Sequence, residues 1–412
     1  MRSTTQDIDR LIREGDAQDP RYASTLIDAL LASSEQVGAS DVHLQPTGEG
    51  LEIRWRIDGV LQPVGQIASE ARSNVVARLK VLADLLTYRT DVPQEGRIRV
   101  GTGDVEMRVS TFPTLHGERA VVRLFGPDGS QLSRIADLGM PAEATAMLGD
   151  LLEETSGAIL VTGPAGSGKT TTVYACMRET VTASEHRRSV VTLEDPIEMA
   201  VEGAAQSQVN ESAGYDLAMG LRSLMRQDPE VIVVGEIRDG ATAEIAFQAA
   251  MTGQLLLTTF HSGSAAGAVS RLLEMGIKPY VLRSGLLAIV AQRLVRRLCD
   301  CSQVSDDTQP PDSEVKCLGL PVDRYAIPVG CDHCRGTGYR GRMLLVEILR
   351  PTDRQIAKSI LERCDAQTIY EAATSCGMVP IWRRACEAVE ARKTSPAEVR
   401  RVLGTFTIPT NP

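Results

Sequence analysis

The sequence predicts an α/β protein whose main domain is built on a parallel sheet and is preceded by a smaller α+β domain. Apolar, strand-like runs alternate with helix-compatible stretches from about residue 138 to about residue 295. Within that region a glycine-rich segment, GPAGSGKT at 163–170, joins one such strand to one such helix. Ahead of it, between residues 51 and 125, apolar and polar residues alternate in several short stretches, as they do in half-exposed strands.

Residues 22–127 have the pattern of a small α+β domain, and the polar residues 1–21 predict a flexible lead-in to it. The dipeptide Asp58-Gly59 follows an alternating run and indicates a tight hairpin, because both turn positions favour residues that tolerate positive φ. The expected helices are 21–38 and 72–86, and the expected strands are 51–57, 97–100, 105–111 and 119–125.

The rest of the chain divides into a linker and three further parts. A Pro-Asp-Gly-Ser break at 127–130 predicts an interdomain linker at 128–137. The main α/β domain is expected at 138–295. A cysteine-containing segment follows at 296–345, and a helical carboxy-terminal subdomain is expected at 346–412.

The segment at 163–170 has the spacing Gly-x-x-x-x-Gly-Lys-Thr of a phosphate-binding loop. Its glycines let the backbone curl so that successive N–H groups point at one anion, beside the positive end of the helix dipole. Lys169 can reach the β- and γ-phosphates, and the Thr170 hydroxyl can bind Mg²⁺. The sequence therefore predicts a nucleoside triphosphate site made by Gly163, Pro164, Ala165, Gly166, Ser167, Gly168, Lys169, Thr170 and Thr171.

A second strand predicts what happens to that nucleotide. Residues 231–234, Val-Ile-Val-Val, are typical of a buried parallel strand, and Gly235 and Glu236 follow directly. The carboxyl ends of parallel strands share one edge of the sheet, so Glu236 is expected beside the phosphate loop. A carboxylate there can polarise the attacking water. The alternative is an ordinary solvated loop acid.

Composition limits the remaining possibilities. The chain has 412 residues, a net charge of −9 and nine cysteines, and a pI near 5.3. This acidic balance argues against nucleic acid as the main partner. The sequence contains no run of 18 apolar residues, the length needed to span a bilayer, and no segment with the features of a signal peptide. An odd number of cysteines beside a nucleotide motif favours a reducing cytoplasm over a disulfide framework.

Several motifs in a fixed order resemble those of a known family. After the phosphate loop stand LEDPIE at 193–198, LRSLMRQDPEVIVVGEIRD at 221–239 and TTFHSGSAAGAVSRLLEMG at 258–276. Ahead of it stand ASDVHLQP at 39–46 and RVSTFPTLHGERAVVRL at 108–124. Together these resemble the type II secretion and type IV pilus assembly ATPases. The resemblance implies a RecA-like, P-loop NTPase core that uses ATP, and a PAS-like amino-terminal domain.

The resemblance also implies roles for acids and a histidine that follow the core strands. Glu194, Asp195 and Glu198 match an acidic box that organises Mg²⁺ and the nucleotide, with Glu194 as a metal and catalytic residue. His261 matches a histidine box that contacts the γ-phosphate or positions water. Without the resemblance, acids at a strand end and a single histidine are equally compatible with ordinary surface or structural residues.

Arginines of the family motifs fall into two groups. Arg222, Arg226, Arg238 and Arg271 match positions around the active site and the subunit interface, and of these Arg238 is expected to be catalytic. Arg108 and Arg123 match positions where the amino-terminal domain reaches over the nucleotide, since family members are hexamers. There a guanidinium fork would neutralise charge that develops on the γ-phosphate. The alternative for each arginine is a surface ion pair.

The cysteines predict a separate metal site. Cys331-Asp332-His333-Cys334 is a Cys-x-x-Cys pair, and Cys299-Asp300-Cys301 is a Cys-x-Cys pair upstream of it. The family's assembly ATPases carry a four-cysteine zinc module at this place, normally with two Cys-x-x-Cys pairs. Zinc is expected at Cys299, Cys301, Cys331 and Cys334, with Cys317 or His333 as substitutes for one ligand. The alternative is a set of reduced thiols without metal.

The phosphate loop and the family resemblance together imply a Mg²⁺-dependent ATPase that forms a homo-hexameric ring in the cytoplasm, peripheral to the inner membrane. It is expected to power pilus or pseudopilus assembly, or type II secretion, through an inner-membrane platform or docking protein. The residues before Arg21 are too few for the long docking domain of many secretion ATPases. Two alternatives stay open: a pilus retraction motor, which the cysteine module disfavours, and a catalytically weak scaffold ordered by nucleotide.

Overall fold

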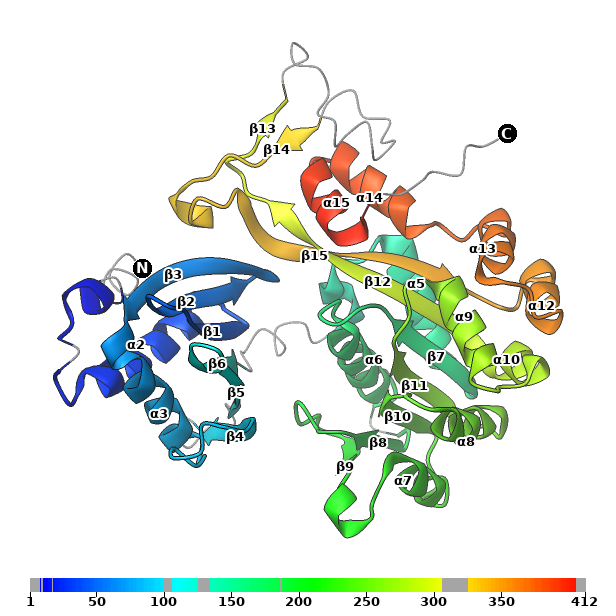
Figure 1. Ribbon diagram of the computed structural model, residues 1–412. Helices are drawn as coiled ribbons and strands as arrows, with labels where there is room; N and C mark the ends of the chain where they lie inside the picture. The colour runs from blue at the N-terminus through cyan, green and yellow to red at the C-terminus, as the bar shows by residue number, and fades with distance from the viewer. Residues whose placement is uncertain are drawn as a thin grey trace. The chain divides into compact units, whose positions relative to one another are not determined.

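The computed structural model describes residues 8, 10–16, 18–99, 106–124, 134–185, 187–305 and 325–404. The chain forms two compact units, residues 1–130 and 131–412 (Figure 1). The predicted order, a smaller α+β unit followed by a larger α/β unit on a mostly parallel sheet, is confirmed.

The amino-terminal unit is a six-stranded antiparallel sheet in the order β3-β2-β1-β6-β5-β4. The helices α2 (Tyr22–Gln36) and α3 (Arg72–Leu82) belong to the same unit. The strands are β1 (Asp41–Pro46), β2 (Gly50–Ile57), β3 (Val60–Ala68), β4 (Gln94–Arg99), β5 (Glu106–Thr114) and β6 (Gly117–Leu124).

One face of this sheet is apolar and packs against α2 and α3. Val42, Leu44, Val109 and Val122 alternate with polar residues along their strands, and all four are buried in one cluster with residues of the two helices. The predicted hairpin between β2 and β3 is confirmed, because Asp58 and Gly59 have φ of 49° and 81°, as a tight two-residue turn requires.

The amino-terminal unit differs from the sequence expectation in three places. The expected flexible lead-in is wrong for part of its length, since residues 10–14 are helical and Ile8 is fully buried in the core of this unit. The helix expected to reach residue 86 ends at Leu82, where Asp84 adopts positive φ. Strand β1 was not expected, because its short segment offers only two apolar side chains on its buried face.

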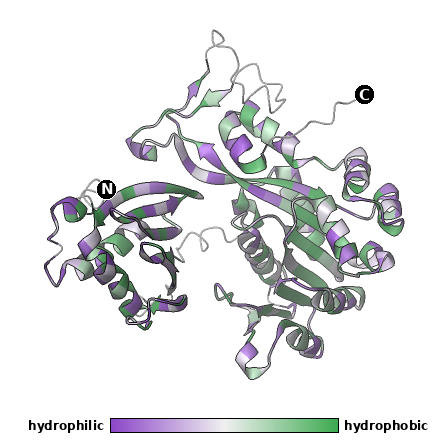
Figure 2. Cartoon of the chain, in the orientation of Figure 1, coloured by the Kyte–Doolittle hydropathy of each residue, from purple (hydrophilic) through white to green (hydrophobic). Residues whose placement is uncertain are grey.

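The larger unit contains a seven-stranded sheet in the order β15-β12-β7-β11-β10-β8-β9. All neighbouring pairs are parallel except β12 with β15. The strands are β7 (Gly157–Thr162), β8 (Val190–Glu194), β9 (Ala204–Gln208), β10 (Val231–Glu236), β11 (Leu255–Phe260), β12 (Leu286–Leu298) and β15 (Tyr339–Leu349). Figure 2 shows the inner strands of this sheet as predominantly hydrophobic.

Helices cover both faces of the large sheet, as expected for a sheet of nearly continuous apolar strands. Alternate residues of β7 divide between the faces: Ile159 and Val161 pack on one side, Ala158 and Leu160 on the other. The first face carries α5 (Ala142–Glu153) and α6 (Lys169–Ala183). The second carries α7 (Leu217–Leu224), α8 (Gly240–Met251), α9 (Ala265–Glu274), α10 (Pro279–Gly285), α12 (Arg354–Leu361) and α13 (Ala366–Ser375).

Strands β12 and β15 cross the domain divisions that the sequence suggested. β12 continues to Leu298 and β15 begins at Tyr339, so both ends of the expected cysteine segment 296–345 belong to the large sheet. The last helices, α14 (Ile381–Glu390) and α15 (Pro396–Leu403), form a small core with these two strands. Likewise Ile135, expected in the linker, is buried in the larger unit. Among the described residues, no helix has the length and apolarity needed to cross a bilayer.

Candidate functional site

The phosphate loop connects the end of β7 to the first turn of α6, as predicted. Gly163, Gly166 and Gly168 have φ of 154°, 74° and 86°, values that residues with a side chain rarely adopt. Gly163 also lacks room for a side chain, because an added Cβ would lie 2.6 Å from the carbonyl oxygen of Gln292. The glycines therefore serve both the curl of the loop and its close packing on β12.

Lys169 opens α6 and folds back over the loop. Its Nζ donates to the carbonyl oxygens of Gly163 at 2.9 Å and Pro164 at 3.1 Å. Burial lowers the pKa of this lysine, and the nearby carboxylate of Glu236 opposes that shift. Thr170 lies half-buried in the same first turn, where the helix leaves its N–H groups without intrahelical acceptors.

His261 lies between Lys169 and Glu236. Its Nε2 is 3.2 Å from Glu236 Oε1, and its Nδ1 is 3.5 Å from Lys169 Nζ. Because an ammonium can only donate and a carboxylate can only accept, this arrangement suits an imidazole that carries its proton on Nε2. Glu236 ends β10, His261 follows β11, and Lys169 opens α6 after the loop that follows β7, so the parallel strands bring the three residues together.

A β-bulge aims the Glu236 side chain. The pairing of β10 with β11 shifts register between Val234 and Glu236, so Gly235 has no partner of its own in that ladder. The carbonyl of Gly235 accepts a hydrogen bond of 2.7 Å from the Thr259 hydroxyl, which fixes the bulge. A glycine at this point separates Glu236 from the strand and turns it toward the loops.

Arg238 connects the Glu236 region to the acidic box. Its Nε is 3.4 Å from Glu236 Oε2, and its Nη1 is 3.5 Å from Asp195 Oδ2. The guanidinium is more than half exposed, so these are screened ion pairs with little stability of their own. They nevertheless place a cation next to the predicted catalytic carboxylate.

Glu194 lies deeper than its predicted role as a Mg²⁺ ligand suggests. Its side chain is buried, and its Oε1 accepts from the Thr192 hydroxyl at 2.6 Å and from Gln206 Nε2 at 3.0 Å. Its other oxygen accepts a short hydrogen bond from Tyr174. Burial and the Glu194 carboxylate raise the pKa of that tyrosine, so its hydroxyl stays a donor. Glu194 in this state braces α6, β8 and β9.

The remaining arginines of the larger unit occupy different settings. Arg271 donates through Nη1 to the carbonyl of His261 at 2.7 Å, and its guanidinium lies 5.5 Å from the Phe260 ring centroid. It therefore supports the loop that carries His261 after β11, called the histidine loop below. Arg222 and Arg226 are exposed at the end of α7, where Arg226 Nη1 donates to the Arg222 carbonyl at 3.0 Å.

Arg108 and Arg123 are direct cross-strand neighbours on β5 and β6. Like charges in such a pair repel each other. Asp41, the next residue across on β1, is buried and accepts from Arg123 Nε at 3.1 Å. The other carboxylate oxygen of Asp41 is 3.4 Å from Arg56 Nε. One carboxylate thus pairs with two arginines, Arg56 and Arg123, on the sheet face opposite the helices.

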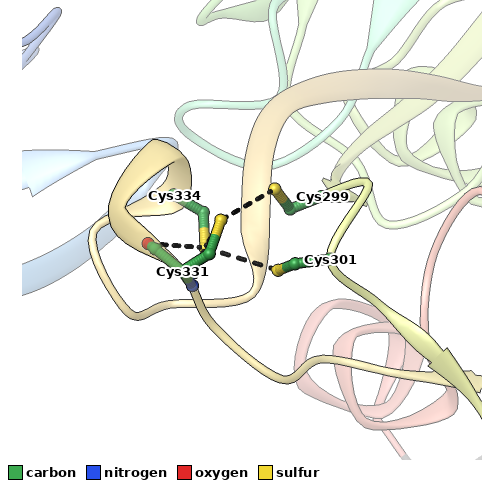
Figure 3. A group of neighbouring side chains, drawn as sticks. All are labelled: Cys299, Cys301, Cys331 and Cys334. Carbon is green, nitrogen blue, oxygen red and sulfur yellow. Dashed lines mark hydrogen bonds between the residues drawn. The ribbon is translucent and has the colours of Figure 1, made fainter.

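The four predicted cysteine ligands lie together (Figure 3). The Sγ–Sγ distances are 3.9 Å for Cys299–Cys331, 3.8 Å for Cys301–Cys334 and 3.7 Å for Cys331–Cys334. A tetrahedron with Zn–S bonds of about 2.3 Å has edges of about 3.8 Å. The donor set and its spacing therefore fit tetrahedral zinc, and the shortened Cys-x-Cys pair still places two thiols in the cluster.

Backbone hydrogen bonds within the segment hold one sulfur of this cluster, Cys334 Sγ, in place. The backbone N–H groups of Cys331 and Gly338 donate to Cys334 Sγ at 3.1 and 3.2 Å. Although desolvation favours the neutral thiol, these bonds lower the pKa of Cys334 to about 6. Of the two substitutes considered from the sequence, His333 is exposed and outside the cluster, and Cys317 lies outside the described residues.

Some supporting residues escaped sequence analysis. Tyr174, Thr192 and Gln206 contact Glu194 from three different elements, and nothing in their local sequence indicates this. Gln292 and Arg293 did leave a signal, since they interrupt the apolar strand β12 with two polar residues. Gln292 contacts the phosphate loop, and Arg293 Nη2 donates to the carbonyl of Gly263 in the histidine loop at 2.6 Å.

Comparisons with known proteins agree with this geometry. Residues 16–401 match the family described as type II/IV secretion system protein. The chain is 44% identical over 345 residues to the type II secretion system ATPase E of Vibrio cholerae. That match covers 82% of this chain and 67% of the relative. It is 38% identical over 410 residues to the type IV pilus assembly ATPase TfpB of Acinetobacter baylyi. That match covers 96% of this chain and 68% of TfpB.

A similar fold occurs among solved structures. The ATPase DotB of Legionella pneumophila superposes with a TM-score of 0.65 at 20% identity, covering 92% of this chain and 95% of that one. At this level of identity the likeness concerns the fold alone.

Proposed function

Because the chain belongs to the type II/IV secretion system protein family, we propose that it is an ATPase that powers pilus or pseudopilus assembly, or type II secretion. The observation that carries the proposal is the convergence of Lys169, His261 and Glu236 at the carboxyl edge of the parallel sheet, where His261 lies 3.5 Å from Lys169 and 3.2 Å from Glu236. Relatives that carry the word ATPase in their names support it.

The chemistry is attack of water on the γ-phosphorus of ATP. Lys169 binds the β- and γ-phosphates, and the Thr170 hydroxyl would hold the Mg²⁺ that accompanies the nucleotide and neutralises its charge. Glu236 orients the water and accepts its proton, while the bond from the γ-phosphorus to the β-phosphate oxygen breaks and ADP and phosphate leave. His261 contacts Glu236 and Lys169 at once, so it links the water side to the phosphate side.

The charged side chains around Glu236 support its assignment as the residue that orients water. Arg238 ion-pairs with Glu236 and Asp195, so it can move to a phosphate when nucleotide enters. Glu194 serves the metal only if its buried hydrogen bonds open, and in the present geometry it acts by bracing the strand that carries Asp195.

The working form is proposed to be a homo-hexamer. Arg108 and Arg123 act on the nucleotide from the amino-terminal domain, and Arg222, Arg226 and Arg271 contribute at or near the subunit interface. ATP turnover rotates the amino-terminal domain against the ATPase domain, and this motion drives assembly. The ring works in the cytoplasm, peripheral to the inner membrane, and docks on a platform protein there rather than on nucleic acid.

Zinc is the proposed occupant of the four-cysteine cluster. The Sγ–Sγ distances of 3.7 to 3.9 Å support it, because they match the edges of a zinc–thiolate tetrahedron. A metal there would crosslink the end of β12 to the segment that leads into β15. The cluster also favours an assembly or secretion motor over a retraction motor.

Hydrolysis by the purified protein tests the proposal. The parent should release phosphate from ATP in the presence of Mg²⁺, and Lys169→Ala should neither bind nor hydrolyse it. Nucleotide binding without turnover under any condition would favour the alternative of a scaffold that nucleotide only orders.

A further inference from the structure

Gln292 is a fully buried polar residue in an otherwise apolar stretch of β12. The strand runs Leu-Leu-Ala-Ile-Val-Ala from Leu286 to Ala291, and Gln292 follows with 0% of its surface exposed. Burying an amide is costly unless its donor and acceptor atoms are both bonded. The bonds that satisfy this amide reach the phosphate loop and the helix behind it.

Two hydrogen bonds hold the side chain in one orientation. Its Nε2 donates to the carbonyl of Ser167 at 2.8 Å, and its Oε1 accepts from the Thr172 hydroxyl at 3.0 Å. A carbonyl can only accept, so the NH₂ group must face Ser167 and the amide oxygen must face Thr172. Thr172 is itself buried on α6, which anchors the amide from behind.

The bond to Ser167 has a consequence for the next N–H group. In a planar trans peptide the C=O and the following N–H point in opposite directions. Pulling the Ser167 carbonyl toward β12 therefore turns the Gly168 N–H away from β12. Gly168 has φ of 86° and precedes the first residue of α6, so its N–H belongs to the donors that a helix start offers to an anion.

We propose that Gln292 is a positioning residue for nucleotide binding, whose amide fixes the Ser167–Gly168 peptide so that its N–H is aimed at the bound phosphate. The inference rests on the proposed function, since it requires nucleotide at this loop. Gln292 touches neither water nor nucleotide in this role. It acts through the backbone of the loop, and Thr172 keeps it in place.

Titration of the full-length protein with Mg²⁺-ADP, together with ATP turnover, tests the idea. Gln292→Met keeps the size of the side chain but can neither donate to Ser167 nor accept from Thr172. Loss of one buried hydrogen bond corresponds to an affinity about three- to tenfold weaker. The KM for ATP should rise by a similar factor with a much smaller change in kcat, because ground-state and transition-state phosphate contacts weaken together.

Thr394→Val is the matched control. Thr394 is also fully buried, and its hydroxyl donates to the carbonyl of Arg296 on the same strand at 2.8 Å, away from the phosphate loop. It should lower the melting temperature without changing ADP affinity. Weaker ADP binding in Gln292→Met but not in Thr394→Val supports the proposal, and parent-like binding in Gln292→Met overturns it.

If Gln292→Met does not fold, Thr172→Val decides the question. That variant removes only the donor that anchors the amide oxygen, so a smaller loss of ADP affinity supports the proposal and unchanged affinity overturns it. A parent protein that binds no ADP would instead contradict the proposed function and is distinguishable from both results.

Discussion

The Glu236 carboxylate contacts an imidazole and a guanidinium, and its role can be tested by removing its charge alone. Glu236→Gln keeps the shape of the side chain but cannot accept a proton from water. Turnover should fall by about 10²–10⁴-fold, the usual contribution of a general base, while ATP affinity stays near the parent value. Single-turnover phosphate release and equilibrium nucleotide binding measure the two quantities separately.

Glu244→Gln is the control for that variant, because Glu244 is an exposed acid on α8 of the same domain. It should leave both quantities unchanged. Parent-like turnover in Glu236→Gln would return Glu236 to the alternative of an ordinary solvated acid.

Residue types with a fixed spacing were predictable, and residues that act through distant contacts were not. Lys169 belongs to a local motif, and Glu236 and His261 each follow an apolar run that predicts a buried strand. Asp41 and Gln292 matter because of partners 82 and 125 positions away. No local pattern encodes such a pairing.

At the scale of elements, α15 is attached to β12 by a buried carboxylate. Glu398 has a side chain with 0% exposure and accepts from Arg296 Nη2 at 2.7 Å and Arg401 Nη2 at 2.6 Å. Burial disfavours the charged acid, but these bonds hold the pKa of Glu398 below its usual range. A lowered folded-state pKa gives stability above the unfolded pKa of about 4.3, and that stability is lost as the pH falls below it.

Glu398→Gln should therefore destabilise the protein by about 2–3 kcal/mol at pH 7, since it weakens hydrogen bonds to charged groups. The difference from the parent should shrink as the pH drops below about 4.3. Chemical unfolding at several pH values measures it. Glu387→Gln, which removes an exposed partner of Arg384, is the control and should cost less than about 1 kcal/mol. A pH-independent difference would show that packing, not charge, holds α15.

The cysteine cluster gives a second prediction at this scale. The purified protein should contain about one zinc per chain, because four thiolates at tetrahedral spacing form a complete site. Cys334→Ser should release the metal and increase hydrogen exchange at 299–304 and 325–339, while the phosphate loop keeps its protection. Cys364→Ser changes a half-buried thiol outside the cluster and should keep the metal. A well-ordered, metal-free parent would contradict the zinc assignment.

Element types with strong periodicity were predictable, and their ends were not. The core strands β7, β10 and β11 follow from β-branched and leucine-rich runs, because both faces of each strand are buried. The pairing of β12 with β15 joins residues about 40 to 60 positions apart around the cysteine segment. Sequence analysis placed domain divisions there, whereas the structure continues the sheet.

At the scale of the whole molecule, the account depends on arginines that lie outside the ATPase domain. Arg123→Ala should lower turnover strongly while ATP affinity falls only modestly, if its guanidinium stabilises charge in the transition state. Arg123→Lys should rescue poorly, because a point charge cannot reproduce a planar fork. Steady-state kinetics with equilibrium binding measures the two effects. Parent-like turnover in Arg123→Ala would reduce Arg123 to the ion pair with Asp41 that the structure shows.

Asp58→Asn is a suitable control for that experiment, because Asp58 lies in the β2–β3 turn of the same unit and asparagine also tolerates its positive φ. It should change neither affinity nor turnover.

The order of the two units was predictable from the change in hydrophobic period along the chain, since alternation gives way to buried runs separated by helices.

The central claim is that this chain turns over ATP as an assembly, and turnover per chain as a function of protein concentration tests it most directly. Phosphate release should be measured across a dilution series, with Lys169→Ala as the blank. The account predicts that the rate per chain rises with concentration as the ring forms and then levels off. A fully active dilute monomer, or bound nucleotide without hydrolysis at any concentration, would contradict it.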